Sequence, residues 1–381
     1  MNPSYDVAII GAGAMGSAAT YHLSQTGQKI LVLDKFIPPH AHGSSHGQSR
    51  IIREAYFESP AYVPLVQQSY LLWNELEKAS AKKLFLKTGG LMLGNKDQKV
   101  FQGAALSAKQ YGIEYDFLDA IKIKNQFPTL QPDKDTVALL EKKAGILFPE
   151  ECIRTQLQLS QKPNVDFHFN ETVVELKCHK EQVTIITNQS NYTARKVIVS
   201  NGAWITSLLP ELNLPLKVKR QVLFWFKCMD KNAEKFLPEN FPVFIWEYAL
   251  NKMFYGFPDL GDGIKIAIHH QGELTTANTI NRNVTAAELQ EITSLANRYF
   301  HANLIYNYAA VCMYTNTPDE NFIIDFHPDH KNIIIVSACS GHGFKFSSAI
   351  GKILCEMVME EKLSFDIKMF ELMRKYEVSS E

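Results

Sequence analysis

The chain lacks the features that mark several classes of protein. Its six cysteines are scattered and no two form a CxxC pair, so neither a zinc site nor a disulfide framework is expected. No apolar run approaches the length that spans a bilayer. The formal net charge of −1 leaves no basic surface for nucleic acid or an anionic membrane. We therefore expect no bound metal, no nucleic-acid partner and no membrane partner.

The remaining composition is that of a globular protein. The 381 residues suffice for two domains with a sizeable core. The first apolar run has no basic leader and leads directly into a glycine turn, so it does not read as a signal peptide. We therefore predict a cytoplasmic location.

The most informative segment is the N-terminal stretch YDVAIIGAGAMGSAATYHLSQTGQKILVLDK. An apolar run leads into Gly11, Gly13 and Gly16, a helical pattern follows, and a second apolar run ends at Asp34. This is the βαβ dinucleotide fingerprint, in which the glycines permit a tight turn, approach of a pyrophosphate and close helix packing. The helix N-terminus attracts the phosphates, and Asp34 is placed to bind a ribose. The fingerprint leaves both NAD and FAD open.

Hydrophobic periodicity in the rest of the chain predicts further helices and strands. A long loop follows Asp34. We expect helices near 65–76 and 97–111, two short strands about a Gly89–Gly90 turn, an antiparallel meander from 167 to a strand at 196–200 and a turn at 201–202, aromatic-rich strands with one helix over 216–310, and a strand, glycine turn and helix over 332–362.

These elements predict a mixed fold, α/β plus α+β, in which two domains are interleaved. A Rossmann-type nucleotide-binding domain takes residues 1–80, 145–215 and 305–381. A substrate domain with a mixed, largely antiparallel sheet takes 81–144 and 216–304.

Two arginines, Arg50 and Arg53, stand at the end of the long loop. Loops of this length in a compact domain are usually functional. If the segment RIIR is helical, both guanidiniums can face one site, where arginine binds carboxylates through a bidentate fork. A solvated surface pair is the alternative.

The segment GIKIAIHHQG predicts a strand with isoleucines on one face and Lys265, Ala267 and His269 on the other. The second face presents an amine and an imidazole with a small residue between them, which leaves room for a ligand. An ordinary half-exposed strand is the alternative.

A further strand is predicted in AAVCMYTNTPDE, with Cys312 and Tyr314 on one face. The residues beside Cys312 give no reason for a lowered thiol pKa. A small buried cysteine without reactivity is therefore the alternative to a functional one.

The segment SGHGFKFSS begins a predicted helix, with Gly341 and Gly343 on either side of His342 and with Lys345 in the first turn. Such a helix start can hold an anion or stabilise negative charge on a ring system. A simple turn capped by Ser340 is the alternative.

Together these segments resemble the monomeric sarcosine oxidase and N-methyltryptophan oxidase family of flavoenzymes. The resemblance covers nearly the whole chain, with the motifs in the family's order. It rests on DVAIIGAGAMGSAA, PPHAHGSSHGQSRIIREAY, YVPL, YGFP followed by KIAIH, VCMYTNTPDENFIID and SGHGFKFSS. The resemblance implies FAD rather than NAD.

The resemblance also implies roles for individual residues. Cys312 would carry the flavin through a thioether to its benzenoid ring. Arg53 and Lys345 would hold the substrate carboxylate. The catalytic set would be Arg50 and Lys265 beside the flavin ring, with Lys265 activating oxygen, and His269 near the substrate amine.

The pocket and cofactor contacts complete the implied site. Tyr255, Tyr314 and Ile245 would line the substrate pocket. The expected FAD contacts are Gly11, Ala12, Gly13, Met15, Gly16, Asp34, Lys35, Ser44, Arg50, Val173, Gly202, Trp204, Cys312, Gly341, His342, Gly343, Phe344 and Lys345.

The implied reaction is oxidation of a secondary, N-methyl amino acid such as sarcosine or N-methyltryptophan by FAD and molecular oxygen. The imine would hydrolyse to formaldehyde and the demethylated amino acid, with release of hydrogen peroxide. The family also implies a monomer. Oxidation of glycated (fructosyl) amino acids or of cyclic imino acids such as pipecolate and proline is the first alternative. An NAD-dependent dehydrogenase and a flavin-binding protein without turnover are the others.

Three positions depart from the family pattern. Ser45 and Gln48 stand where the family has histidine and aspartate, so contacts to the flavin or to Arg50 are expected to differ. Trp246 joins Ile245 in the expected pocket wall, where smaller or more flexible residues are usual. This leaves the size of the substrate open.

Overall fold

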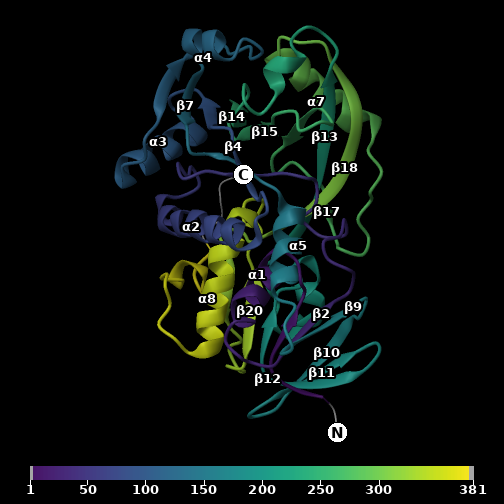
Figure 1. The fold of residues 1–381 in the computed structure, drawn as a ribbon. Coiled ribbons are helices and arrows are strands. Elements are labelled where there is room, and N and C mark those ends of the chain that lie inside the picture. The colour runs from purple at the N-terminus through teal and green to yellow at the C-terminus, as the bar shows by residue number, and fades with distance from the viewer. Residues whose placement is uncertain (1–2, 377–381) are drawn as a thin grey trace.

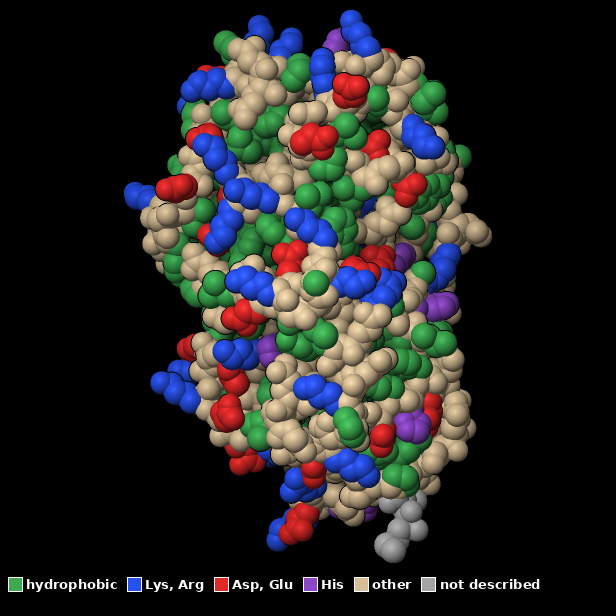
Figure 2. Space-filling view, viewed as in Figure 1, with side chains coloured by type: hydrophobic (Ala, Val, Ile, Leu, Met, Phe, Trp, Pro, Cys, Tyr) green, Lys and Arg blue, Asp and Glu red, His purple; other side chains and the backbone are tan. Residues whose placement is uncertain are grey.

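The computed structural model describes residues 3–376, arranged around two large sheets and one small sheet. Figure 1 shows the molecule as two stacked lobes, with the nucleotide fingerprint in the lower lobe and the second large sheet in the upper lobe. Figure 2 shows acidic and basic side chains interspersed over the same face. Within the described residues no helix is long and apolar enough to cross a membrane.

The lower lobe is built on an eight-stranded sheet. Its strands are β1 (Ser4–Ile10), β2 (Ile30–Asp34), β9 (Val165–Phe169), β10 (Val173–Cys178), β11 (Val183–Thr187), β12 (Asn191–Val199), β19 (Ile323–Phe326) and β20 (Ile333–Ser337). β1 pairs in parallel with both β2 and β12. The first half of β12 pairs with β11 and its second half with β20, so the meander joins the parallel sheet through one long strand.

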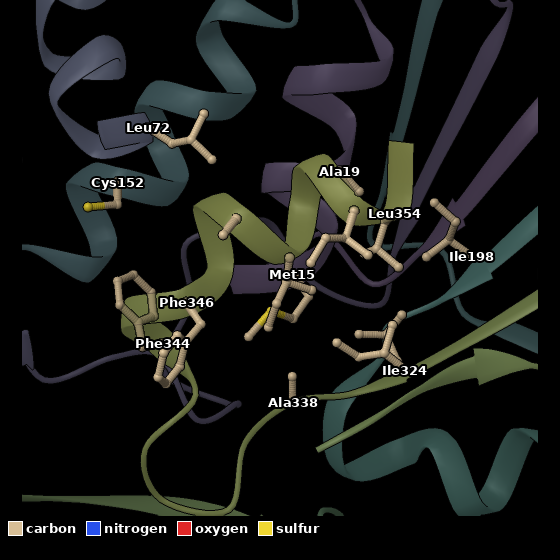
Figure 3. Packing of buried hydrophobic residues seen from close by; sticks show 14 of the residues in the cluster. Met15, Ala19, Leu72, Cys152, Ile198, Ile324, Ala338, Phe344, Phe346 and Leu354 are labelled. Carbon is tan, nitrogen blue, oxygen red and sulfur yellow. The ribbon is translucent and has the colours of Figure 1, made fainter. Parts of the chain in front are cut away.

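Four helices of this lobe cover one face of the sheet. They are α1 (Ala14–Leu23), α2 (Val63–Ser80), α5 (Pro149–Leu159) and α8 (Ser347–Met359). Figure 3 shows Met15 and Ala19 of α1 packed near Leu354 of α8, with Ile198 of the sheet beside them. The helices α1 and α8 cross so closely that a Cβ on Gly351 would lie 2.5 Å from the Ala18 backbone. This packing fixes the N-terminus of α1 above the sheet.

The upper lobe contains a nine-stranded, largely antiparallel sheet. Its strands are β5 (Gly90–Gly94), β6 (Asp116–Asp119), β7 (Val137–Glu141), β13 (Lys217–Cys228), β14 (Val243–Ala249), β15 (Lys252–Phe257), β16 (Ile264–Ile268), β17 (Leu274–Thr275) and β18 (Leu304–Asn316). The helices α3 (Lys99–Tyr111), α4 (Ala120–Gln126) and α7 (Ala286–Tyr299) pack against it, and the short α6 (Ile205–Leu208) lies in the lower lobe. A third sheet joins β3 (Arg50–Ile52), β8 (Gly145–Leu147) and β4 (Phe85–Lys87).

Most of the expected elements are confirmed, and three are corrected. The segment at Arg50 is a strand paired with β8, because its apolar residues fill a small sheet, and is not a helix. The strands on either side of Gly89 do not pair with each other, because β4 joins β8 and β5 joins β7 and β14. The strand β9 pairs with β2 and stands outside the meander.

The division into two interleaved domains stays a proposal. One expected domain boundary lies at residue 305, near the start of β18. We expect residues from 305 onward to belong to the nucleotide domain. β18 pairs along its length with β13 of the upper sheet and carries Cys312 toward the lower lobe.

Candidate active site

A cavity of about 470 Å³ extends between the two large sheets. Most of the residues that the sequence nominated line it. They are Gly11, Gly13, Met15, Asp34, Lys35, Ser44, Arg50, Arg53, Val173, Gly202, Trp204, Ile245, Tyr255, His269, Cys312, Tyr314, Gly341, His342, Gly343, Phe344 and Lys345. Ala12, Gly16 and Lys265 lie behind this lining. Segments from both lobes therefore converge on one site.

Each of the three fingerprint glycines is needed for a different structural reason. Gly11 has φ +92°, and a Cβ there would lie 2.6 Å from the Cα of Asn201. A Cβ on Gly16 would lie 1.7 Å from the carbonyl oxygen of Gly11. Apart from its two chain neighbours, no described residue has an atom within 4 Å of a Cβ on Gly13, because Gly13 borders the cavity. Gly11 and Gly16 thus keep the turn tight, whereas Gly13 leaves space for a ligand.

The polar groups of this cavity fit a bound dinucleotide. Helix α1 begins at the cavity with no side-chain cap on its first N–H groups, which is the arrangement that binds phosphates. Three buried side-chain oxygens in the lining, those of Asn201, Thr315 and Ser337, have no hydrogen-bond partner among residues 3–376. Since buried polar atoms are normally paired, the cavity suits a ligand rich in polar groups.

Asp34 and its neighbours shape the far end of the cavity. The Asp34 carboxylate accepts hydrogen bonds from Ala12 N (2.7 Å) and Phe36 N (2.8 Å), which fixes the glycine turn to the end of β2. The side-chain oxygen of Asn278 accepts from Trp204 Nε1 (2.8 Å) and from Lys35 Nζ (3.3 Å). The loop carrying Asn278 therefore closes over this end.

Arg53 is held, almost fully buried, at the cavity (1% exposed). Its guanidinium donates to Glu58 Oε2 (2.6 Å) and to the carbonyl oxygen of Ala55 (2.9 Å). Glu141 of β7 accepts from Glu54 N and Ala55 N, which fixes the chain just after Arg53. Burial disfavours the Glu58 carboxylate, but Arg53 outweighs that effect and lowers its pKa. Arg53 and Glu58 form a buried ion pair that faces the ligand.

Lys345 reaches the same part of the cavity from the one-turn 3₁₀ helix Phe344–Phe346, which precedes α8. We expected it in the first turn of the helix itself. Its ammonium donates to the carbonyl oxygen of His342 (2.6 Å) and to Tyr56 Oη (3.4 Å). Burial, and next the positive charge of Arg53, lower the pKa of Lys345 to about 7.

Arg50 and Lys265 both bind backbone carbonyls of the segment 44–49. Arg50 donates to the carbonyl oxygens of Ser44, His46 and Ser49. Lys265 Nζ lies 2.9 Å from the carbonyl oxygens of Gly47 and Ser49. Burial lowers the pKa of Lys265 well below its usual value, and Arg50 adds to the effect.

Cys312 lines the cavity from β18 and is 1% exposed. Burial raises the pKa of its thiol, while Arg50 and Lys265 oppose that rise. The alternation predicted for this strand holds, since Tyr314 also lines the cavity and its hydroxyl lies 3.3 Å from that of Tyr255. A second thiol, Cys339, borders the same cavity.

The pocket wall corrects one expectation. Ile245 lines the cavity, but Trp246, its neighbour on β14, points into the core and stacks on Phe254 with ring centroids 5.7 Å apart. Alternate residues of a strand face opposite sides, so Trp246 does not form the wall. Gln48 is also directed elsewhere, because its amide donates to Asp262 (2.9 Å) and to Tyr308 Oη (3.2 Å).

Sequence reasoning missed Glu58, Tyr56, Asn201 and Asn278. Tyr56 ends the segment PPHAHGSSHGQSRIIREAY on which the resemblance rests, and Glu58 lies two residues beyond it, so a carboxylate five residues after Arg53 was the available signal. Nothing in the local pattern marks Asn278, whose partners Lys35 and Trp204 are 243 and 74 residues away.

Comparisons with known proteins show the family of this chain. A family model described as FAD dependent oxidoreductase matches residues 6–357. The chain is 40% identical over 377 residues to the monomeric sarcosine oxidase of Streptomyces avermitilis, covering 97% of this chain and 98% of that protein. It is 36% identical over 376 residues to an N-methyl-L-tryptophan oxidase of Escherichia coli, covering 97% and 99%.

Among solved structures, NikD, an unusual amino acid oxidase essential for nikkomycin biosynthesis, has the same fold. Its TM-score is 0.85 at 19% identity, covering 99% of this chain and 100% of that chain. The glycine turn, the uncapped start of α1 and the polar cavity are what such a fold needs to hold FAD. The chain belongs to the family of FAD-dependent oxidoreductases and is a flavin-dependent enzyme.

Proposed function

We propose that the enzyme is an oxidase of a secondary, N-methyl amino acid such as sarcosine or N-methyltryptophan. The observation that carries the proposal is the pair of buried cationic groups, Arg53 and Lys345, beside the aromatic wall of Tyr255 and Tyr314. Such a pair suits a carboxylate next to an apolar group. Relatives named for sarcosine and for N-methyl-L-tryptophan, at 36–40% identity, support the same substrate class.

The charges of the site suit an amine that must lose its proton before oxidation. An aliphatic amine has a pKa of roughly 10 in water, like lysine. Arg50, Arg53 and Lys265 disfavour a further positive charge nearby and so favour the neutral amine. Burial lowers the pKa of His269 well below its usual value, so its neutral imidazole can accept a hydrogen bond from the substrate.

FAD, when bound, supplies the two-electron chemistry that oxidises the C–N bond and passes the electrons to oxygen. The chain's own contribution is to bind the carboxylate through Arg53 and Lys345 and to surround the ring with positive charge from Arg50 and Lys265. We further propose that Cys312 attaches the flavin covalently. The relatives that carry the word monomeric in their names support a monomer.

Product analysis tests the proposed function. With sarcosine and oxygen we expect formaldehyde, glycine and hydrogen peroxide in equal amounts. A cyclic imino acid such as pipecolate releases no formaldehyde, and a fructosyl amino acid releases a sugar fragment instead. If hydrogen peroxide forms only with a cyclic imino acid or only with a fructosyl amino acid, that class is the substrate and the proposal of an N-methyl amino acid is wrong.

Lys265→Met is expected to slow the reaction of the reduced enzyme with oxygen about 100-fold, because it removes one preorganised positive charge. Reduction by the substrate should change less than about tenfold. Stopped-flow absorbance measures the two half-reactions separately. Lys252→Met, at an exposed position on β15, is the matched control. Equal slowing of both half-reactions would count against a role in oxygen activation.

A further inference from the structure

A chain of buried hydrogen bonds extends from Lys345 to the far side of His342. Lys345 Nζ donates to Tyr56 Oη at 3.4 Å, and Tyr56 Oη lies 2.6 Å from His342 Nδ1. His342 Nε2 lies 2.9 Å from the carbonyl oxygen of Glu320. Tyr56 is completely buried, and both other side chains are more than nine-tenths buried.

The direction of these hydrogen bonds follows from the last of them. A backbone carbonyl only accepts, so Nε2 of His342 carries the proton. Burial lowers the pKa of His342 to about 3, so the imidazole is neutral and its Nδ1 is bare. The Tyr56 hydroxyl must then donate to Nδ1, which turns its oxygen lone pairs toward Lys345.

This arrangement restricts what Lys345 can do. An ammonium has three N–H donors, and the carbonyl oxygen of His342 and the hydroxyl of Tyr56 take two of them. The third is left for the cavity that Lys345 lines. Both acceptors are neutral oxygens, so they hold the ammonium without cancelling its charge.

We propose that Tyr56 and His342 are positioning residues that stabilise the protonated form of Lys345 and aim one N–H at the substrate carboxylate. The proposal rests on the proposed function, in which Lys345 binds that carboxylate. No residue of this chain is added to the reacting atoms. Tyr56 and His342 act through Lys345.

The charged and titratable groups facing Lys345 come from several elements. They are Arg50 in β3, Arg53, Tyr56 and Glu58 in the segment after β3, His269 after β16, and His342. Glu58 favours the ammonium, whereas the arginines and burial disfavour it. Carboxylate binding needs the ammonium, so it should weaken as the pH rises through the pKa of Lys345, near 7 in the free enzyme. Removing an acceptor should lower that pKa and move the weakening to lower pH.

The test is binding of acetate, a carboxylate without an amine, to the holoenzyme between pH 6 and 9. The perturbed flavin absorbance reports binding without turnover, and acetamide is the neutral control ligand. We expect Tyr56→Phe to bind acetate about tenfold more weakly at pH 8 and to shift the midpoint of the pH dependence downward by about one unit. His342→Leu, which leaves the Tyr56 hydroxyl without its acceptor, should act in the same direction.

Tyr62→Phe is the matched control, because the Tyr62 ring lies 5.1 Å from that of Tyr56 but its hydroxyl donates to Asn321. If Tyr56→Phe and His342→Leu bind acetate with the wild-type pH profile, the positioning role is wrong while the carboxylate site stands. If the wild-type enzyme binds no acetate at any pH, Arg53 and Lys345 do not form a carboxylate site, and the proposed function is wrong on that point. Should Tyr56→Phe fail to fold, His342→Leu and the wild-type profile decide.

Discussion

Replacing Arg53 with methionine is expected to lower kcat/KM for an N-methyl amino acid about a thousandfold. Arg53 is almost fully buried, and its fork can bind a carboxylate through two hydrogen bonds. Removing one member of a buried charge pair costs about 4 kcal/mol, which is about three powers of ten. Arg53→Lys keeps the charge but loses the fork, so it should recover only part of the activity. Steady-state kinetics with sarcosine measures both variants.

The Arg53 prediction needs two controls, because the substitution also leaves Glu58 buried without its partner. Arg53→Met combined with Glu58→Gln removes that unpaired carboxylate and separates substrate binding from folding. Arg154→Met, at an exposed site on α5, checks for a general effect of charge. The methyl ester of the same amino acid should lose little activity in the variant, because it lacks the carboxylate. Loss of less than tenfold with the free acid would contradict the assignment.

Replacing Cys312 with alanine is expected to reduce the covalently bound flavin from essentially all of the holoenzyme to none. Cys312 lies in the cavity wall close to the cationic groups of Arg50 and Lys265, which favour its thiolate against burial. Acid precipitation distinguishes covalently bound flavin from flavin that is bound without a covalent link. The yellow colour should stay with the precipitated wild-type protein and pass into the supernatant for Cys312→Ala.

Cys339→Ala provides the matched control for this measurement, since Cys339 lines the same cavity from the loop after β20. It should keep the flavin in the precipitate. If the flavin stays in the precipitate of Cys312→Ala and passes into the supernatant of Cys339→Ala, Cys339 is the residue that binds the flavin covalently. Free flavin in the wild-type supernatant would show that the cofactor is not covalently bound.

Local sequence pattern predicted the elements whose neighbours in space are also neighbours in sequence. The βαβ unit at Gly11–Asp34 and the helix α2 follow from hydrophobic periodicity and glycine spacing. The alternation in β16 placed Lys265 and Ala267 on one face, and Ile264 and Ile266 indeed join the core on the other. The resemblance then nominated residues that line one cavity, although their roles stay proposals.

Local sequence pattern does not predict contacts between segments that are far apart in the sequence. Arg50 reads equally well in a helix or a strand, and only pairing with β8, about a hundred residues later, decides for a strand. The carbonyl oxygens that hold Lys265 come from more than 200 residues away, and Tyr56 meets His342 across 286 residues. Trp246 was misplaced because adjacent strand residues were assigned to one wall, whereas the pleat sends them to opposite sides.

The central claim is that a secondary amino acid held by Arg53 and Lys345 delivers electrons to FAD. An anaerobic absorbance titration of the purified holoenzyme tests it most directly, with sarcosine, N-methyltryptophan, pipecolate, proline and a fructosyl amino acid as separate titrants. We predict that the flavin bands bleach with sarcosine or N-methyltryptophan and stay unchanged with the other three. Bleaching only with a cyclic or glycated amino acid, or with none of the five, would contradict the claim.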